Sequence, residues 1–220
     1  MIRRLLLAAV IALGLVSAVA RAAEGAAAPA AAAKPDLDKA ATTAKNVCAA
    51  CHGADGNSVA PANPTIAAMP SEYIARQLAD FKAGIRVNPI MQPIAAQLSP
   101  ADMAALGVYF SQQKAKPQGA KDATLVQAGQ KLYRGGDAAH GIPACSGCHG
   151  PAGAGVPKNF PRLAGQHTDY TVAQLKAFKA GERGNDKEGK DVNGRIMAAI
   201  AARMDENQMR AAAEYVQGLR

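Results

Sequence analysis

The sequence predicts an all-α protein made of two similar domains in tandem. Several segments place apolar residues at helical spacing, and no stretch of alternating apolar residues is long enough for a β-strand. The second half of the chain repeats the plan of the first half. About 180 residues follow the N-terminal segment, which is ample for two compact domains of fewer than about 100 residues each.

Residues 1–23 are predicted to be a secretory signal peptide. A basic flank precedes an apolar stretch, and Ala20-Arg21-Ala22 gives a small-residue cleavage pattern. The alternative is a retained membrane anchor, but the apolar stretch of residues 5–20 is shorter than the roughly 20 residues that span a bilayer. Residues 24–39 form a leader rich in Ala and Pro that cannot bury an apolar face. The sequence therefore predicts an exported protein.

The internal repeat relates the two halves at an offset of 97 residues. The segment Cys48-Ala-Ala-Cys51-His52-Gly53 corresponds to Cys145-Ser-Gly-Cys148-His149-Gly150. The correspondence continues through the pairs Gly56 and Gly153, Pro64 and Pro161, Tyr73 and Tyr170, Gln77 and Gln174, Phe81 and Phe178, Gly84 and Gly181, and Arg86 and Arg183. After Asn185 the second copy carries nine additional residues, so that Met91 corresponds to Met197 at an offset of 106.

The repeat divides the exported part into an N-terminal domain (40–113), a polar linker (114–123) and a C-terminal domain (124–220). The whole chain has no Trp, four Phe and five Tyr, which leaves few bulky side chains for two small cores. Something other than side chains is therefore expected to fill part of each core.

Each domain is predicted to contain three helices separated by loops. In the first domain Ser71 is the expected N-cap of the middle helix, and Gly84 is expected to end it. The last helix is expected to follow Ser99 at the N-cap and Pro100 in the first turn, and Asp205 is the corresponding cap in the second domain. The buried faces are predicted to contain Ile74, Leu78 and Phe81, then Met103, Leu106 and Phe110, and in the second domain Met209, Ala212 and Val216.

All four cysteines lie in the two Cys-x-x-Cys-His motifs. In an exported protein this spacing lets two thiols bond the vinyl groups of one haem while the adjacent His binds the iron. The alternatives are two disulfides, a Cys₄ zinc site and a thioredoxin-like redox pair, none of which requires a His directly after the second Cys. The sequence therefore predicts two covalent haem c groups, held by Cys48, Cys51 and His52 and by Cys145, Cys148 and His149.

The sixth ligand of each iron separates an electron carrier from an enzyme. A Met thioether stabilises ferrous iron and saturates its coordination, which favours fast electron transfer. Met91 and Met197 correspond under the repeat and lie in predicted loops, with Pro89 breaking the helix before Met91. They are the predicted ligands. Met69 has no counterpart in the second domain, and core positions are predicted for Met103, Met204 and Met209.

Two further histidines are expected at the surface. His140 lies in a Gly-rich loop before Cys145, and His167 precedes the middle helix of the second domain. Exposed or hydrogen-bonded surface roles are the default for both, and they become candidate ligands only if Met197 does not bind iron.

The motifs resemble those of the diheme cytochromes c4, whose halves are each similar to a class I, cytochrome c553-like domain. The resemblance covers about residues 40–220 and is carried by the two haem motifs and by Tyr73 to Met91, Tyr133-Arg-Gly-Gly136, Phe160 to His167 and Arg183-Gly-Asn185-Asp186. It implies two tandem class I cytochrome c domains with His/Met haems, related by a pseudo-twofold axis and located in the bacterial periplasm. It also implies that the carbonyls of Pro64 and Pro161 accept hydrogen bonds from His52 and His149.

The predicted function is the transfer of single electrons between respiratory partners, with a respiratory complex as donor and, by resemblance, a terminal oxidase as acceptor. No catalytic residue is predicted. One alternative is the cytochrome subunit or dedicated acceptor of a dehydrogenase. Another is a diheme enzyme such as a peroxidase, which requires an open sixth position. Peripheral membrane association is left open.

The charge distribution adds an expectation about docking. The net charge of +8 falls to about +5 when three arginines leave with the signal, which is too small to argue for nucleic-acid binding. Residues 24–117 carry eight Lys and Arg against seven Asp and Glu, while residues 118–220 carry fourteen against ten. The second domain is therefore expected to offer the more basic surface, with Lys187, Lys190 and Arg195 beside its haem.

Overall fold

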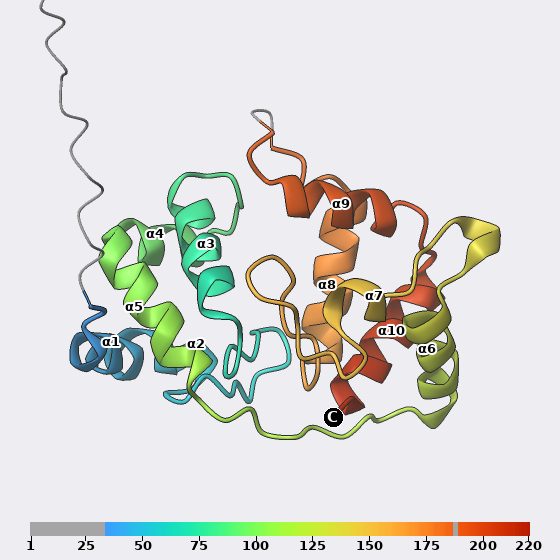
Figure 1. Ribbon diagram of the computed structural model, residues 1–220, viewed down its shortest axis with the longest axis horizontal. Helices are drawn as coiled ribbons and strands as arrows, with labels where there is room; N and C mark the ends of the chain where they lie inside the picture. The colour runs from blue at the N-terminus through green and yellow to red at the C-terminus, as the bar shows by residue number, and fades with distance from the viewer. Residues whose placement is uncertain (1–33, 187–188) are drawn as a thin grey trace, which may run out of the picture. The chain divides into compact units, whose positions relative to one another are not determined.

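Short helices and long loops alternate in both halves of the chain (Figure 1). The computed structural model describes residues 34–186 and 189–220, so the predicted signal peptide, most of the leader and Lys187 lie outside the described residues. The first domain contains α1 (Leu37–Thr43), the π-helix η1 (Ala44–Cys48), α2 (Ala49–His52), α3 (Ser71–Lys82), α4 (Met91–Ala96) and α5 (Pro100–Ser111). The second contains α6 (Ala123–Gly135), the 3₁₀ helix η2 (Ala138–His140), α7 (Ser146–His149), α8 (Thr168–Lys179), α9 (Val192–Ala201) and α10 (Glu206–Gly218). The prediction of an all-α fold is confirmed, because the described residues form two isolated β-bridges and no strand.

The first domain is built around α5, which packs against α1 and α3. Ser99 caps α5 as predicted: its hydroxyl accepts a hydrogen bond from Asp102 N (3.1 Å), and the Asp102 carboxylate accepts one from Ser99 N (3.0 Å). The predicted core residues are buried, namely Ile74, Leu78 and Phe81 of α3 and Met103, Leu106 and Phe110 of α5. The caps and the apolar spacing thus place two helix faces against one core.

The second domain is built around α10, which packs against α6 and α8. Asp205 caps α10 as predicted, accepting from Gln208 N at 2.7 Å. Gly129 of α6 allows the close approach, since a Cβ there would lie 2.0 Å from Ala211 O and 2.7 Å from Tyr215 Cβ. This contact holds Tyr133 in the core with 0% exposure.

Three local predictions are corrected by the structure. Met91 and Met197 lie on helices α4 and α9 rather than in loops, so each domain has more helices than the three predicted. The reason is side-chain hydrogen bonding where each helix begins: Asn88 Oδ1 accepts from Met91 N (2.9 Å) just before α4, and Asp191 caps α9 by accepting from Gly194 N (2.8 Å). Ser71 is the first residue of α3 rather than its cap. Its hydroxyl instead donates to the neighbouring Glu72 carboxylate (2.8 Å).

The first helix starts within the segment predicted to be a leader. Asp36 caps α1, with its carboxylate accepting from Lys39 N at 2.9 Å. Ala40 and Ala44 of the following turns are 3% and 0% exposed in the first core. The N-terminal domain of the structure therefore begins about one helical turn before residue 40.

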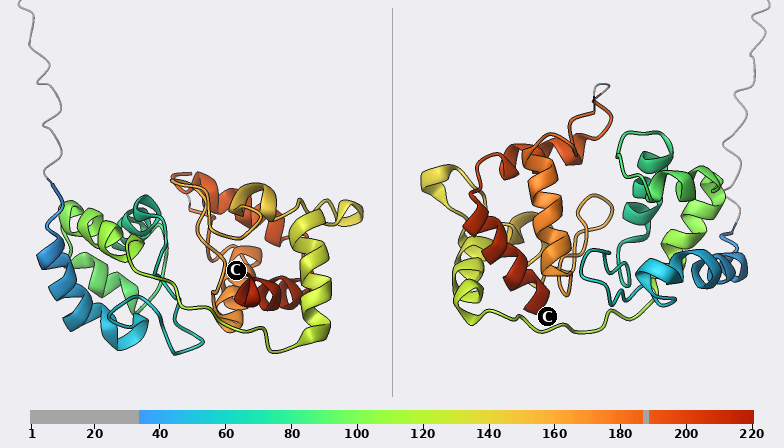
Figure 2. Two further views of the ribbon diagram at one scale, coloured as in Figure 1. Left: turned by 60° about the horizontal axis from the view of Figure 1, so that its bottom comes forward. Right: turned by 180° about the vertical axis from the view of Figure 1, so that it is seen from behind.

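The linker runs in extended conformation from α5 to α6 (Figure 2). The buried Glu214 of α10 fixes its end, because its carboxylate accepts from Lys121 N and from Asp122 N (Asp122 at 2.8 Å). Thr168 of α8 donates its hydroxyl to the same carboxylate at 2.9 Å. Within the described residues, no helix is long and apolar enough to cross a bilayer.

Candidate functional site

The first Cys-x-x-Cys-His motif lies at the end of a continuous run of helix from α1 through η1 to α2. His52 Nδ1 lies 2.9 Å from the carbonyl oxygen of Pro64, which leaves Nε2 available for a metal. The loop between them is closed at Gly56, whose carbonyl accepts from Ile66 N (2.7 Å). Gly56 has φ of +75°, and a Cβ there would lie 2.7 Å from Ala67 N, so only Gly fits this turn.

The second motif repeats this arrangement at the short helix α7. His149 Nδ1 lies 2.9 Å from the Pro161 carbonyl oxygen. Gly153 takes the place of Gly56, accepting from Leu163 N at 2.8 Å. The buried Tyr133 hydroxyl donates to Gly150 O at 2.6 Å, next to the histidine. The α6 and α10 pair therefore supports the motif directly.

Burial sets the protonation of both motifs in the polypeptide. It lowers the pKa of His52 and of His149, which favours the neutral imidazole that binds metals. It also raises the pKa of the Cys48 and Cys145 thiols to about 11. Cys48 and Cys145 are thus thiols, and His52 and His149 are neutral donors, at neutral pH.

One continuous cavity of about 970 Å³ is lined by both motifs. Met91 and Met197 line it as half-buried side chains. Met69 and Met204 also line it but are only 5% and 3% exposed within the apolar clusters. The structure thus brings all of the predicted cysteine, histidine and methionine residues to a common space.

The cavity and its donors fit two haem groups. Two arginines that line it, Arg76 and Arg162, have a buried Nε without a hydrogen-bond partner among the described residues. Haem carboxylates are acceptors of the right charge for such groups. The thiols of each motif would hold the porphyrin and its histidine the iron, which supplies one-electron redox chemistry when bound.

The comparisons with known proteins agree with this donor set. The family model described as Cytochrome c matches the chain twice, over residues 37–114 and 126–220. A cytochrome c4 from Pseudomonas aeruginosa is 43% identical over 174 residues, covering 79% of this chain and 84% of the relative. The chain belongs to the diheme cytochrome c4 family. The crystal structure of reduced cytochrome c4 from Pseudomonas stutzeri superimposes with a TM-score of 0.76 at 38% identity, covering 84% of this chain and 99% of that one.

Other relatives carry a different name. A protein called thiosulfate dehydrogenase electron acceptor, from Thiomonas intermedia, is 40% identical over 172 residues and covers 77% of this chain and 76% of the relative. Cytochromes c4 are electron carriers, so the predictions of two haem c groups and of a carrier rather than an enzyme are confirmed.

The two cytochrome c4 domains meet through a reciprocal hydrogen-bond network that the sequence did not reveal. We call this the interface network, and it consists of Tyr73, Gln77 and Arg86 of the first domain and of Tyr170, Gln174 and Arg183 of the second. Arg86 donates to the Tyr170 hydroxyl (3.0 Å) and Gln174 Oε1 (2.9 Å). Arg183 makes the matching contacts to Tyr73 (3.0 Å) and Gln77 (3.0 Å). The only sequence signal was the retention of these polar residues in both copies.

A second set of interface contacts corrects the prediction for His167, which is buried rather than on the surface. It is 6% exposed, and its Nε2 lies 2.9 Å from the carbonyl oxygen of Ser58 in the first domain. The neighbouring Gln166 accepts from Thr65 N and donates to Thr65 O, both at 2.9 Å. His167 is therefore a structural contact between domains.

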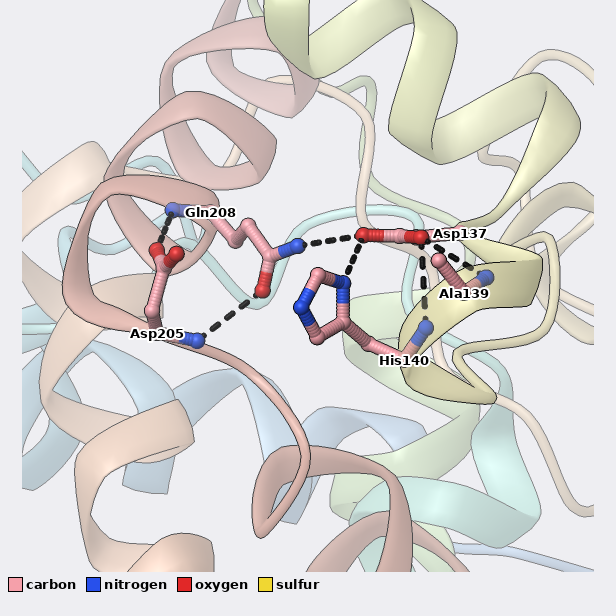
Figure 3. A network of polar contacts seen from close by, with 5 residues as sticks. All are labelled: Asp137, Ala139, His140, Asp205 and Gln208. Atoms are coloured by element: carbon pink, nitrogen blue, oxygen red, sulfur yellow. Dashed lines mark hydrogen bonds and ion pairs between the residues drawn. The ribbon is translucent and has the colours of Figure 1, made fainter.

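His140 is exposed, as predicted, and has a local role (Figure 3). Its Nδ1 lies 2.6 Å from Asp137 Oδ2, and this bond lowers the pKa of the Asp137 carboxyl. Gln208 Nε2 donates to the same oxygen at 2.8 Å. The network joins the loop before the second haem motif to the first turn of α10.

Proposed function

We propose that the chain is a periplasmic electron carrier in which Met91 completes the iron coordination begun by His52, and Met197 that begun by His149. The main support is that these two methionines, which are equivalent under the repeat, are half-buried and line the same cavity as both haem motifs. A sulfur ligand saturates the iron and stabilises its ferrous form, which suits a carrier of single electrons.

Substitution of Met91 tests the assignment. Met91→His should lower the reduction potential of one haem and leave the other nearly unchanged, because His stabilises ferrous iron less than Met. Met69→Leu is the matched control, since Met69 lines the same cavity but is 5% exposed in the core. Loss of the sulfur-to-iron absorption band in Met69→Leu, rather than in Met91→His, would assign the ligand to Met69.

The proposed partners are redox proteins, with a respiratory complex as donor and a terminal oxidase as acceptor. A second candidate, the dedicated acceptor of a dehydrogenase, is favoured by the 40% identity to the thiosulfate dehydrogenase electron acceptor. Stopped-flow reduction by a quinol-oxidising complex and by a thiosulfate dehydrogenase separates the two. A respiratory shuttle should be reduced faster by the first, whereas a dedicated acceptor should be reduced faster by the second.

Docking is proposed at the second haem through α9. Arg195 is exposed two residues before Met197, and Val192 and Ile196 of the same helix are 55% and 44% exposed. A basic side chain beside apolar ones attracts an acidic partner at long range and gives it a surface to pack on. Arg195→Gln should slow electron transfer to an acidic partner and weaken its salt dependence. An unchanged rate and salt slope would place docking elsewhere.

A further inference from the structure

The interface network is symmetric except for one carboxylate. Gln77 Oε1 accepts from both arginines of the network, Arg86 Nη1 (2.7 Å) and Arg183 Nη2 (3.0 Å). Its Nε2 donates to Asp80 Oδ2 at 3.0 Å. At the repeat position of Asp80 the second domain has Ala177, so the acid belongs to the first domain alone.

Asp80 is surrounded by a mixed set of charges. Asp191, at the start of α9 in the second domain, faces it, and so do three guanidinium groups, those of Arg76, Arg86 and Arg183. Burial and Asp191 raise the pKa of Asp80 to about 6, against the opposing effect of the arginines.

The helices packed on α3 add no further charge to this set. Helix α4 contains no charged residue. The charged residue of α5, Asp102, forms an ion pair with Lys39 at 2.6 Å. Within the described residues, the interface network also contains the hydroxyls of Tyr73 and Tyr170, which accept from Arg183 and Arg86.

We propose that Asp80 binds a proton when the haem of the first domain is reduced, so that electron uptake by this domain is proton-linked. The carboxylate is one hydrogen bond away from Gln77, which lines the haem cavity. An electron delivered by the redox partner adds one negative charge to the haem. Because Asp80 is half-buried, the protein around it screens that charge less than water would. The electron reduces ferric to ferrous iron, and a solvent proton converts the Asp80 carboxylate to the carboxylic acid. Oxidation reverses both steps.

This inference goes beyond the proposed function but rests on its assignment of His52 and Met91 to the first haem. The test is the midpoint potential of each haem in the two-haem protein between about pH 5 and pH 8, a range that brackets the raised pKa of the Asp80 carboxyl. The potential of the first haem should fall as the pH rises through this range, and Asp80→Asn should remove the slope. The substitution keeps the size of the side chain and an oxygen that accepts from Gln77.

Glu72→Gln is the matched control, because Glu72 is an exposed carboxylate in the first turn of the same helix. It should leave the slope intact. Infrared difference spectra of reduction give an independent readout: a carboxylic acid band should form in the parent and be missing in Asp80→Asn. A slope that persists in Asp80→Asn, or that Glu72→Gln removes equally, overturns the inference. If the parent protein has no sulfur-to-iron absorption band, the assignment of methionine ligands is refuted instead.

Discussion

The crossing of α6 and α10 makes Gly129 the most sharply testable residue of the fold. A Cβ at this position would lie 2.0 Å from a backbone oxygen, whereas an ordinary contact needs about 3.5 Å. Overpacking of this kind costs about 1–3 kcal/mol, and the gain in helix propensity from Gly to Ala offsets about 0.8–1 kcal/mol. Because the clash is with backbone, the upper end applies, and Gly129→Ala should lose about 2 kcal/mol of unfolding free energy.

Gly135 provides the matched control on the same helix. It is exposed, and a Cβ there would meet nothing within 4 Å. Gly135→Ala should therefore gain about 0.5–1 kcal/mol. Guanidinium unfolding of the two-haem protein, followed by far-UV circular dichroism, should separate the unfolding free energies of the two variants by about 2.5–3 kcal/mol. Equal stability of the two variants would refute the close-packing argument.

Three further predictions concern polar contacts. Burial opposes the charge of Glu214, but its N–H and hydroxyl donors outweigh burial and hold its pKa below the ordinary value. Its stabilising contribution is therefore present at neutral pH and lost as the pH falls through that pKa, so acid unfolding of Glu214→Gln should depend less on pH than that of the parent. Gln166→Ala leaves both backbone groups of Thr65 unpaired and should cost about 1–3 kcal/mol in thermal or denaturant unfolding; no change would mean that water replaces the amide. His140→Ala should raise the pKa of Asp137 toward its ordinary value in an NMR titration, and an unmoved pKa would contradict the contact in Figure 3.

Local chemistry was readable from the sequence, and tertiary contacts were not. Ser99 and Asp205 were predicted as caps because a cap depends on residues within one turn. The helices that carry Met91 and Met197 were missed, because Pro and Gly lower the helix propensity of these segments and the hydrogen bonds from Asn88 and Asp191 at the helix starts outweigh that effect. The burial of His167 depends on Ser58, which is 109 residues away in the chain.

In the candidate site, too, the local motifs were predicted and the contacts between domains were not. Two Cys-x-x-Cys-His motifs are a complete local signal for haem attachment, and they predicted the cofactor. The interface network gave no such signal, because its hydrogen bonds form only when the two repeats face each other. The sequence showed that both copies have an arginine at this repeat position, Arg86 and Arg183, but it did not indicate a role for them.

Carbon monoxide binding to the fully reduced two-haem protein tests the central claim most directly. If a methionine saturates each iron, as proposed for Met91 and Met197, the visible spectrum should change little on addition of the gas, because neither iron has an open position. Met91→Ala, in which one position is opened, should bind about one equivalent and serve as the positive control. Binding of one or two equivalents by the parent protein would contradict the account of a carrier with two saturated irons.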